Sequence, residues 1–293
     1  MAKILGIGIA TVDIINTVED YPAENDEIRA FSQRRCRGGN CANTLTVLQQ
    51  LGHECTFAGI LAEEPAGQFI TQELKQQGIN MDYCRTVTGK TPTSYVILSR
   101  ATGSRTIVHY RDLPEFSFAD FANIDLSPFD WLHLEGRNVA ETARMLALVR
   151  ERFPSLPWSV EIEKPRPGIE SLFEEAAVLL FSRHYVTYHG YSKAQAFLQK
   201  WHTTLPDTEK ICVWGEAGAY AIDEGGKIHH APAFFPPQVV DTLGAGDTFN
   251  AGFLDARLRH RSLSESLTFG CQLAGRKCGQ QGFDGLGSRE SGP

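Results

Sequence analysis

The chain has 293 residues, of which 42% are apolar and 22% are charged, and its formal net charge is −7. This length and composition are typical of a globular protein with a sizeable core, and they exclude disorder as the dominant state. The negative charge and the absence of a dense Lys/Arg run argue against nucleic acid as the main partner. The seven cysteines are scattered and contain no CxxC pair, which disfavours a disulfide framework or a zinc site and indicates reduced thiols in a cytoplasmic protein.

The N-terminal apolar run is short and reaches Asp13 without a small-residue cleavage pattern, so we predict no signal peptide. No stretch approaches the roughly 20 apolar residues that a membrane-spanning helix requires. The sequence therefore predicts no membrane partner.

Strand and helix patterns alternate along most of the chain. Strands are expected at residues 3–10, 55–60, 131–134, 158–162, 178–182, 211–214 and 219–222. Helices are expected at residues 39–51, 65–77, 139–152, 168–175, 192–201, 246–259 and 262–279. Such alternation predicts parallel βαβ units and a sheet that is covered by helices on both faces.

Three further strand patterns do not fit this alternation. Residues 93–99 and 105–110 are rich in strand formers and are separated by a short Gly-containing turn, which is typical of a hairpin. Residues 27–35 form a more polar candidate strand. We expect these segments to form a small sheet outside the main one.

The most informative segment is VVDTLGAGDTFNAGF, residues 239–253, where a glycine-rich turn leads into a helix that is expected to begin near Asp247. Glycines allow a backbone to approach a ligand closely, and the free amides at a helix start attract anions. Asp247 would place a base beside such an anion site, which suits the deprotonation of a hydroxyl that attacks a phosphoryl group. The competing interpretation is that Asp247 only caps the helix and that the glycines only form a tight turn.

A second glycine-rich stretch, RGGNCAN at residues 37–43, also precedes a helix. Asn40 and Asn43 are three residues apart and share one helix face, and their amide groups can both donate to and accept from a polyol's hydroxyls. Simple N-capping by Asn40 is the alternative. Asp13 follows the first strand, where ligands bind in open parallel sheets, although Asp13 taken alone favours the competing interpretation of a surface loop residue.

Two stretches carry a resemblance to a known family. GGNCANTLTVLQQLG resembles the first signature of the ribokinase (PfkB) carbohydrate kinases, and DTLGAGDTFNAGF resembles their second, more specific signature. Within the family, the ketohexokinase branch is the most similar, on the stretches EIRAFSQRRCRGGN, GSRTIVHYRDLP, WLHLEGRN and VEIEKPR. The resemblance extends from about residue 4 to residue 286.

The resemblance implies a single α/β domain over residues 1–293, built as a Rossmann-like three-layer αβα sandwich with a small β-sheet lid. The lid strands would lie at about residues 11–18, 27–35, 93–99 and 105–110. Two such lids would clasp to form a homodimer. The implied reaction is transfer of the γ-phosphoryl group of ATP, with Mg²⁺, to a ketohexose, converting fructose to fructose 1-phosphate; activation by K⁺ is left open. The alternatives are a kinase for another sugar or a nucleoside, and a non-catalytic sugar sensor on the same fold.

The resemblance also implies roles for individual residues. Asp247 would be the general base, and the amides of Gly244, Ala245 and Gly246 would form the anion hole. The sugar would be held by Asp13, Gly39, Asn40, Asn43 and Arg105. The nucleotide would be held by Trp214, Glu216, Gly218, Phe234, Phe235, Cys271 and Ala274.

Two departures from the family pattern affect these roles. The Asn-x-x-Glu motif that helps to place magnesium in many members is replaced by Ser-Arg-His-Tyr at residues 182–185, so the metal ligands are unknown, with Glu161 and Glu163 as candidates. The acidic lid residue of ketohexokinase-like members would have to be supplied by Asn25 or Asp26, which leaves the identity of the sugar open.

Overall fold

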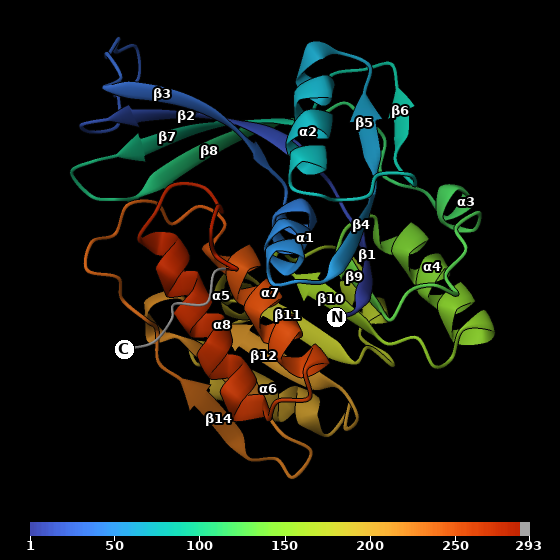
Figure 1. The fold of residues 1–293 in the computed structure, drawn as a ribbon. Helices are drawn as coiled ribbons and strands as arrows, with labels where there is room; N and C mark the ends of the chain where they lie inside the picture. Colours follow the sequence, from blue (N-terminus) through green and yellow to red (C-terminus); the bar gives the residue numbers. More distant parts are fainter. Residues whose placement is uncertain (288–293) are drawn as a thin grey trace.

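An eight-stranded sheet forms the centre of the molecule, for which the computed structural model describes residues 1–287 (Figure 1). The strand order is β14-β13-β12-β11-β10-β9-β1-β4, with parallel pairing from β4 to β12 and antiparallel pairing of β12 with β13 and of β13 with β14. The strands are β1 (Lys3–Ile7), β4 (Glu54–Ala58), β9 (Trp131–Glu135), β10 (Trp158–Ile162), β11 (Val178–Ser182), β12 (Glu209–Val213), β13 (Ala219–Ile222) and β14 (Ile228–Ala231). The parallel core matches the expected βαβ units, whereas β14 was not predicted, because its four residues, IHHA, give too short a pattern.

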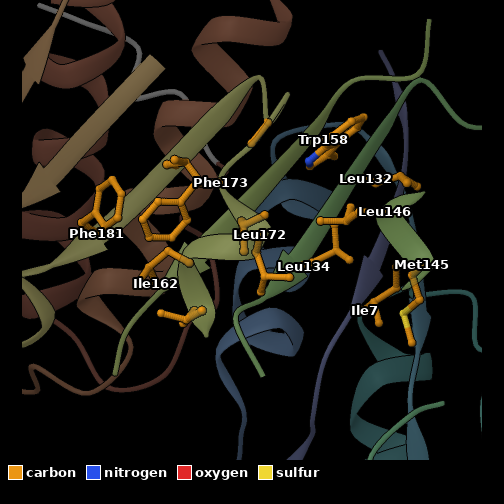
Figure 2. Close-up of a cluster of buried hydrophobic side chains, with 14 of the residues drawn as sticks. Ile7, Leu132, Leu134, Met145, Leu146, Trp158, Ile162, Leu172, Phe173 and Phe181 are labelled. Carbon is orange, nitrogen blue, oxygen red and sulfur yellow. The ribbon is translucent and has the colours of Figure 1, made fainter. Parts of the chain in front are cut away.

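Helices cover both faces of this sheet and bury two apolar clusters. Side chains of successive strand residues point to opposite faces, so Leu132 and Leu134 join one cluster while Trp131 joins the other. Figure 2 shows the first cluster, in which Leu146 of a covering helix lies close to these two leucines and Met145 lies beside Ile7. The helices on this face are α3 (Phe118–Phe121), α4 (Val139–Arg152), η1 (Ile169–Leu172), α5 (Arg183–Tyr188) and α6 (Ala194–His202). The other face carries α1 (Asn40–Gln50), α7 (Ala245–Leu258) and α8 (Leu263–Cys278). These layers confirm the predicted αβα arrangement.

A four-stranded sheet stands above one end of the main sheet (Figure 1). Its order is β3-β2-β7-β8, formed by β2 (Thr11–Val18), β3 (Ser32–Gly38), β7 (Thr93–Ser99) and β8 (Arg105–Tyr110). The expected strand at residues 27–35 is wrong in its bounds. β3 begins only at Ser32, because its antiparallel pairing with β2 runs from Thr17 opposite Ser32 to Thr11 opposite Gly38. The polar sequence before Ser32 gave no alternation from which this register could be read.

A third, two-stranded sheet pairs β5 (Ile60–Ala62) with β6 (Arg85–Val87), and α2 (Pro65–Gln76) connects the two strands along the chain. The strand expected at residues 55–60 is therefore split between β4 and β5. Among residues 1–287, no helix is both long and apolar enough to cross a bilayer. The last six residues of the predicted domain, 288–293, lie outside the described part of the chain.

Candidate active site

A cavity of about 530 Å³ lies between the main sheet and the four-stranded sheet. Its floor is formed where the parallel strands end, with Glu135 at the end of β9, Glu161 in β10 and Ser182 at the end of β11. Its roof includes Asp13 of β2 and His109 of β8. Open α/β sheets bind ligands at this edge, where the carboxyl ends of parallel strands meet.

The glycine-rich turn forms one wall of the cavity and leads into α7. Gly244 is the N-cap residue with φ of +77°, a left-handed conformation that favours glycine, and the helix begins at Ala245. Asp247 is therefore the third helical residue and not the cap, which excludes the capping interpretation of this residue. The amides of Gly246 and Asp247 belong to the first turn, where intrahelical carbonyl partners are lacking. The Ala245 amide differs, since it donates to the carbonyl oxygen of Thr242 at 3.3 Å.

The carboxylate of Asp247 is held by an amide from the second glycine-rich stretch. Asn43 Nδ2 donates to Asp247 Oδ2 at 2.7 Å, and the Asp247 residue is only 7% exposed. Burial raises the pKa of Asp247 to about 7, and Glu163 and Glu135 add to the increase, whereas the Asn43 hydrogen bond and Arg37 oppose it. A carboxyl group with a pKa near neutrality is well suited to accept a proton from a hydroxyl at physiological pH.

Glu161 lies in the same cavity and is held by the neighbouring asparagine. Asn40 Nδ2 donates to Glu161 Oε1 at 3.2 Å, so two amides in one turn of α1 each hold one buried carboxyl group. Asn40 is not the N-cap of α1, because Gly39 occupies that position with φ of +102° and no side chain caps the helix. Burial raises the pKa of Glu161 well above its usual value, and the nearby Asp247 raises it further.

Glu135 holds the start of α1 in place through hydrogen bonds to backbone amides. Its Oε1 accepts the backbone amides of Ile9 at 3.1 Å and Cys41 at 2.9 Å. It therefore ties the loop after β1 to the first turn of the helix that carries both asparagines. Glu135 was not predicted from the sequence, because a lone acid at a strand end has no pattern of its own.

The residues predicted to hold the sugar all line this cavity. Asp13 lies within β2 and accepts from Thr11 Oγ1 at 2.9 Å, and burial raises its pKa. A Cβ atom at Gly38 would lie 2.3 Å from Asp13 Oδ2, so glycine is required there to leave room for the carboxylate. Arg105 of β8 reaches the glycine-rich turn and donates to Thr242 Oγ1 at 3.2 Å. The structure thus brings these side chains together, and their roles stay predictions.

His109 of β8, which was not among the predicted site residues, also faces the cavity. Its Nδ1 lies 3.2 Å from Ser94 Oγ, and burial lowers its pKa. The alternation of β8, which points every second side chain to one face, is the signal that could have placed it beside Arg105.

Asn25 and Asp26 were the candidates for the acidic lid residue. Asn25 has φ of +69°, and the Asp26 amide donates to the Ala23 carbonyl at 3.2 Å, so both belong to an exposed turn. The described residues that line the cavity include neither Asn25 nor Asp26.

Acidic side chains in the cavity fit a magnesium ion that arrives on a nucleotide. Glu161 Oε2 is buried and has no hydrogen-bond partner among the described residues, and Glu163 lines the same space. Within residues 1–287, no group of three or more His, Cys, Asp or Glu side chains is arranged to hold a metal ion by itself. Mg²⁺ commonly keeps several waters and binds one or two carboxylates together with substrate phosphates, which matches this arrangement.

None of the seven residues predicted for the nucleotide lines this cavity, and Gly218 and Cys271 lie beside Ala231. A Cβ atom at Gly218 would lie 2.0 Å from the Ala231 carbonyl, and Cys271 Sγ donates to the same carbonyl at 3.6 Å. Phe234 packs against α8 but is 44% exposed. Trp214 is nearer the cavity, since the guanidinium of the cavity residue Arg183 lies 5.7 Å from its ring. Their part in nucleotide binding stays a prediction.

The family's sequence profile, described as pfkB family carbohydrate kinase, matches residues 1–153 and 173–285. Ketohexokinase of Mus musculus is 41% identical over 97% of this chain and 98% of its own length. Ribokinase of Giardia lamblia has a TM-score of 0.82 at 16% identity, covering 99% of this chain and 97% of that one. The structure of Arabidopsis thaliana ribokinase complexed with ribose and ATP has a TM-score of 0.76 at 23% identity, covering 96% and 94%. The sequence match and the shared fold show that this chain belongs to the pfkB family of carbohydrate kinases.

Proposed function

We propose that this chain transfers the γ-phosphoryl group of ATP to a hydroxyl of a ketohexose and converts fructose to fructose 1-phosphate. One observation carries the chemical part of this proposal: the buried carboxyl group of Asp247 lies at the anion-attracting start of α7 inside a cavity of about 530 Å³, which is large enough to hold a sugar. The 41% identity to mouse ketohexokinase over nearly the whole chain supports fructose as the acceptor.

In the proposed reaction, Asp247 accepts the proton of the sugar hydroxyl while the hydroxyl oxygen forms a bond to the γ-phosphorus. The bond between that phosphorus and the β,γ-bridging oxygen breaks, and ADP leaves with the electron pair. The amides at the turn, those of Gly246 and Asp247 above all, stabilise the negative charge on the phosphoryl oxygens as it is transferred. Glu161 and Glu163 are the residues that would face a magnesium ion bound to ATP, through water, and such an ion would neutralise part of the phosphate charge.

The test is a coupled ADP-release assay with Mg·ATP on a panel of fructose, other ketoses, glucose, ribose, adenosine and fructose 6-phosphate, in parallel KCl and NaCl buffers. Turnover with fructose and formation of fructose 1-phosphate, identified by NMR, is the expected result. Turnover with another acceptor but not with fructose would support the kinase reaction and show that this other acceptor is the substrate. Sugar binding without turnover would favour the sensor. A difference between the two buffers would reveal activation by K⁺.

The rate is expected to depend on pH through Asp247. Because burial raises its pKa to about 7, the carboxylate that can accept a proton predominates only above that pH in the free protein. We expect kcat/KM to fall by about tenfold for each pH unit below 7 and to level off above it. The measurement is the kcat/KM for fructose between about pH 5.5 and 8.5 with a saturating nucleotide. If kcat/KM does not fall at the acidic end of that pH range, the proton is accepted by another group.

We also propose that two copies of the chain associate through the four-stranded sheet. β8 is an edge strand on which all six residues are exposed, and its Val108, 64% exposed, lies opposite Tyr95 of β7, 48% exposed. Apolar side chains on an exposed sheet edge favour association, and a second copy offers the same surface in an isologous contact. All seven cysteines are free thiols, which supports a reducing compartment such as the cytoplasm.

Replacing Tyr95 with glutamate is expected to convert the dimer to a monomer in sedimentation velocity, because it places two charges in the buried contact. Tyr188→Glu is the matched control, since Tyr188 is 68% exposed on α5 of the main domain. The interface is elsewhere if Tyr95→Glu sediments like the unaltered protein, and dimerisation itself is wrong if the unaltered protein is monomeric.

A further inference from the structure

Asp241, at the start of the glycine-rich turn, is contacted by two cations from different parts of the fold. Lys277 of α8 places its ammonium 3.0 Å from Asp241 Oδ2 and 3.0 Å from the Asp241 carbonyl oxygen. Arg34 of β3 in the four-stranded sheet donates to the same Oδ2 at 2.7 Å. The Asp241 and Lys277 side chains are 5% and 1% exposed, respectively, so this cluster is nearly dry.

Inside this cluster, Asp241 shapes the turn that follows it. Its Oδ1 accepts the amide of Leu243 at 3.0 Å, and its own amide donates to the Cys278 carbonyl at 3.2 Å. The ammonium of Lys277 also lies 5.6 Å from the ring of Phe283, whose edge would be 2.4 Å from a Cβ at Gly244. The carboxylate is therefore fixed on the main-domain side, together with the backbone that presents the anion-binding amides.

The charges in the cluster depend on one another. Burial by itself raises the pKa of Asp241, but Lys277, the Leu243 amide and Arg34 hold it below its usual value. Burial lowers the pKa of Lys277, and Asp241 opposes that decrease. An unpaired buried charge is costly, so the carboxylate requires its cations. Lys277 belongs to the same body as the turn, whereas Arg34 comes from the small sheet.

We propose that Asp241 is a positioning residue for phosphoryl transfer, and that the Arg34–Asp241 ion pair couples closure of the four-stranded sheet to the ordering of the anion-binding turn. Arg105, which donates to Thr242 Oγ1 from β8, adds a second contact between the same two parts. The turn is then fully ordered only when the sheet is closed over the cavity. This inference rests on the proposed function for its kinetic consequences, but not for its structural ones.

The decisive variant is Arg34→Met, because the Arg34 side chain is 27% exposed and its loss leaves the buried Lys277–Asp241 pair intact. We expect hydrogen–deuterium exchange of residues 241–246 to rise together with that of residues 32–38. The kcat for sugar phosphorylation is expected to fall by about tenfold or more, because small displacements of reacting groups reduce rates steeply. The Arg34→Lys variant should recover part of the lost kcat and part of the lost protection against exchange. The matched control is Arg35→Met, since Arg35 lies on the same strand but stacks on Phe69 of α2, 4.4 Å from the ring centroid.

A double-mutant cycle with Asp241→Asn separates coupling from general loosening. We expect Arg34→Met to have little further effect in the Asp241→Asn background, because its partner's charge is already gone. Equal effects of Arg34→Met in both backgrounds would overturn the inference, as would unchanged exchange of residues 241–246 in the single variant. If the unaltered protein phosphorylates no member of the acceptor panel, the proposed function fails while the exchange measurements still decide the coupling.

Discussion

The Asp247→Asn variant is expected to lower kcat for fructose phosphorylation by roughly 10²–10⁴-fold, the usual contribution of a positioned general base. Asparagine has the same shape but cannot accept the proton. The Asn43 contact, at 2.7 Å in the unaltered protein, involves only one oxygen of the side chain, so an amide can keep it with little rearrangement. The substitution should therefore remove proton transfer without disturbing the cavity.

Three measurements distinguish this outcome from misfolding. The coupled assay gives kcat, calorimetry gives the affinity for Mg·ADP, and thermal denaturation gives Tm. We expect only kcat to change strongly, and the acidic limb of the pH profile to disappear along with it. The control is Asp284→Asn, since Asp284 is an exposed aspartate at the cavity rim whose Oδ1 accepts from Gln77. Turnover of Asp247→Asn near that of the unaltered protein would remove Asp247 from the mechanism.

The Gly39→Ala variant is expected to lower the free energy of unfolding by about 3 kcal/mol or more, a loss characteristic of strained or overpacked sites. Gly39 has φ of +102°, where a side chain is strained, and a Cβ there would lie 2.1 Å from the Ile9 carbonyl oxygen. The Ile9 carbonyl oxygen is part of the backbone, which cannot move aside as a flexible side chain can. Because Asn40 follows directly, the remaining folded protein should also lose sugar affinity.

Gly52→Ala is the matched control for this prediction. Gly52 has a similar φ of +93°, but a Cβ there would have no neighbouring atom within 4 Å, so alanine meets the backbone strain alone. We expect a loss of about 1–2 kcal/mol, the usual cost of a left-handed conformation for a residue with a Cβ. Urea denaturation of both variants measures the difference, which isolates the collision with Ile9. Equal losses would show that the loop after β1 moves aside.

Sequence patterns predicted the elements that have strong periodicity or sharp ends. The helix at residues 139–152 and the strands at residues 158–162 and 178–182 have the predicted bounds, because their patterns of apolar residues end sharply at loops. The predicted start of α7, at residues 246–247, is one to two residues late, since the helix begins at Ala245. Asp247 resembled a cap in sequence, whereas the glycine at 244 takes that position through its left-handed backbone.

Pairwise polar contacts were beyond the reach of sequence patterns. Nothing in the sequence marked Lys277, 36 residues further along the chain, as the partner of Asp241. Arg37 is buried between Asn43 and Thr46, with a pKa lowered to about 10 by burial, although arginines in a polar stretch usually face solvent. Such residues are identified by which distant elements the fold brings together, and single-sequence periodicity does not contain that information.

The two asparagines of α1 have a consequence for the turnover cycle. Thr44 Oγ1 donates to the Asp247 carbonyl at 3.3 Å, so α1 and α7 are joined at the backbone as well as through Asn43. Asp13, on the four-stranded sheet, belongs to the other side of the cavity. If the sheet lifts away when product leaves, as we propose, the contacts from Asp13 are released while Asn43 and Thr44 keep the proposed base, Asp247, in place. In this proposed cycle, each round begins with Asp247 already in place, and the four-stranded sheet and the anion-binding turn become ordered again around the next sugar.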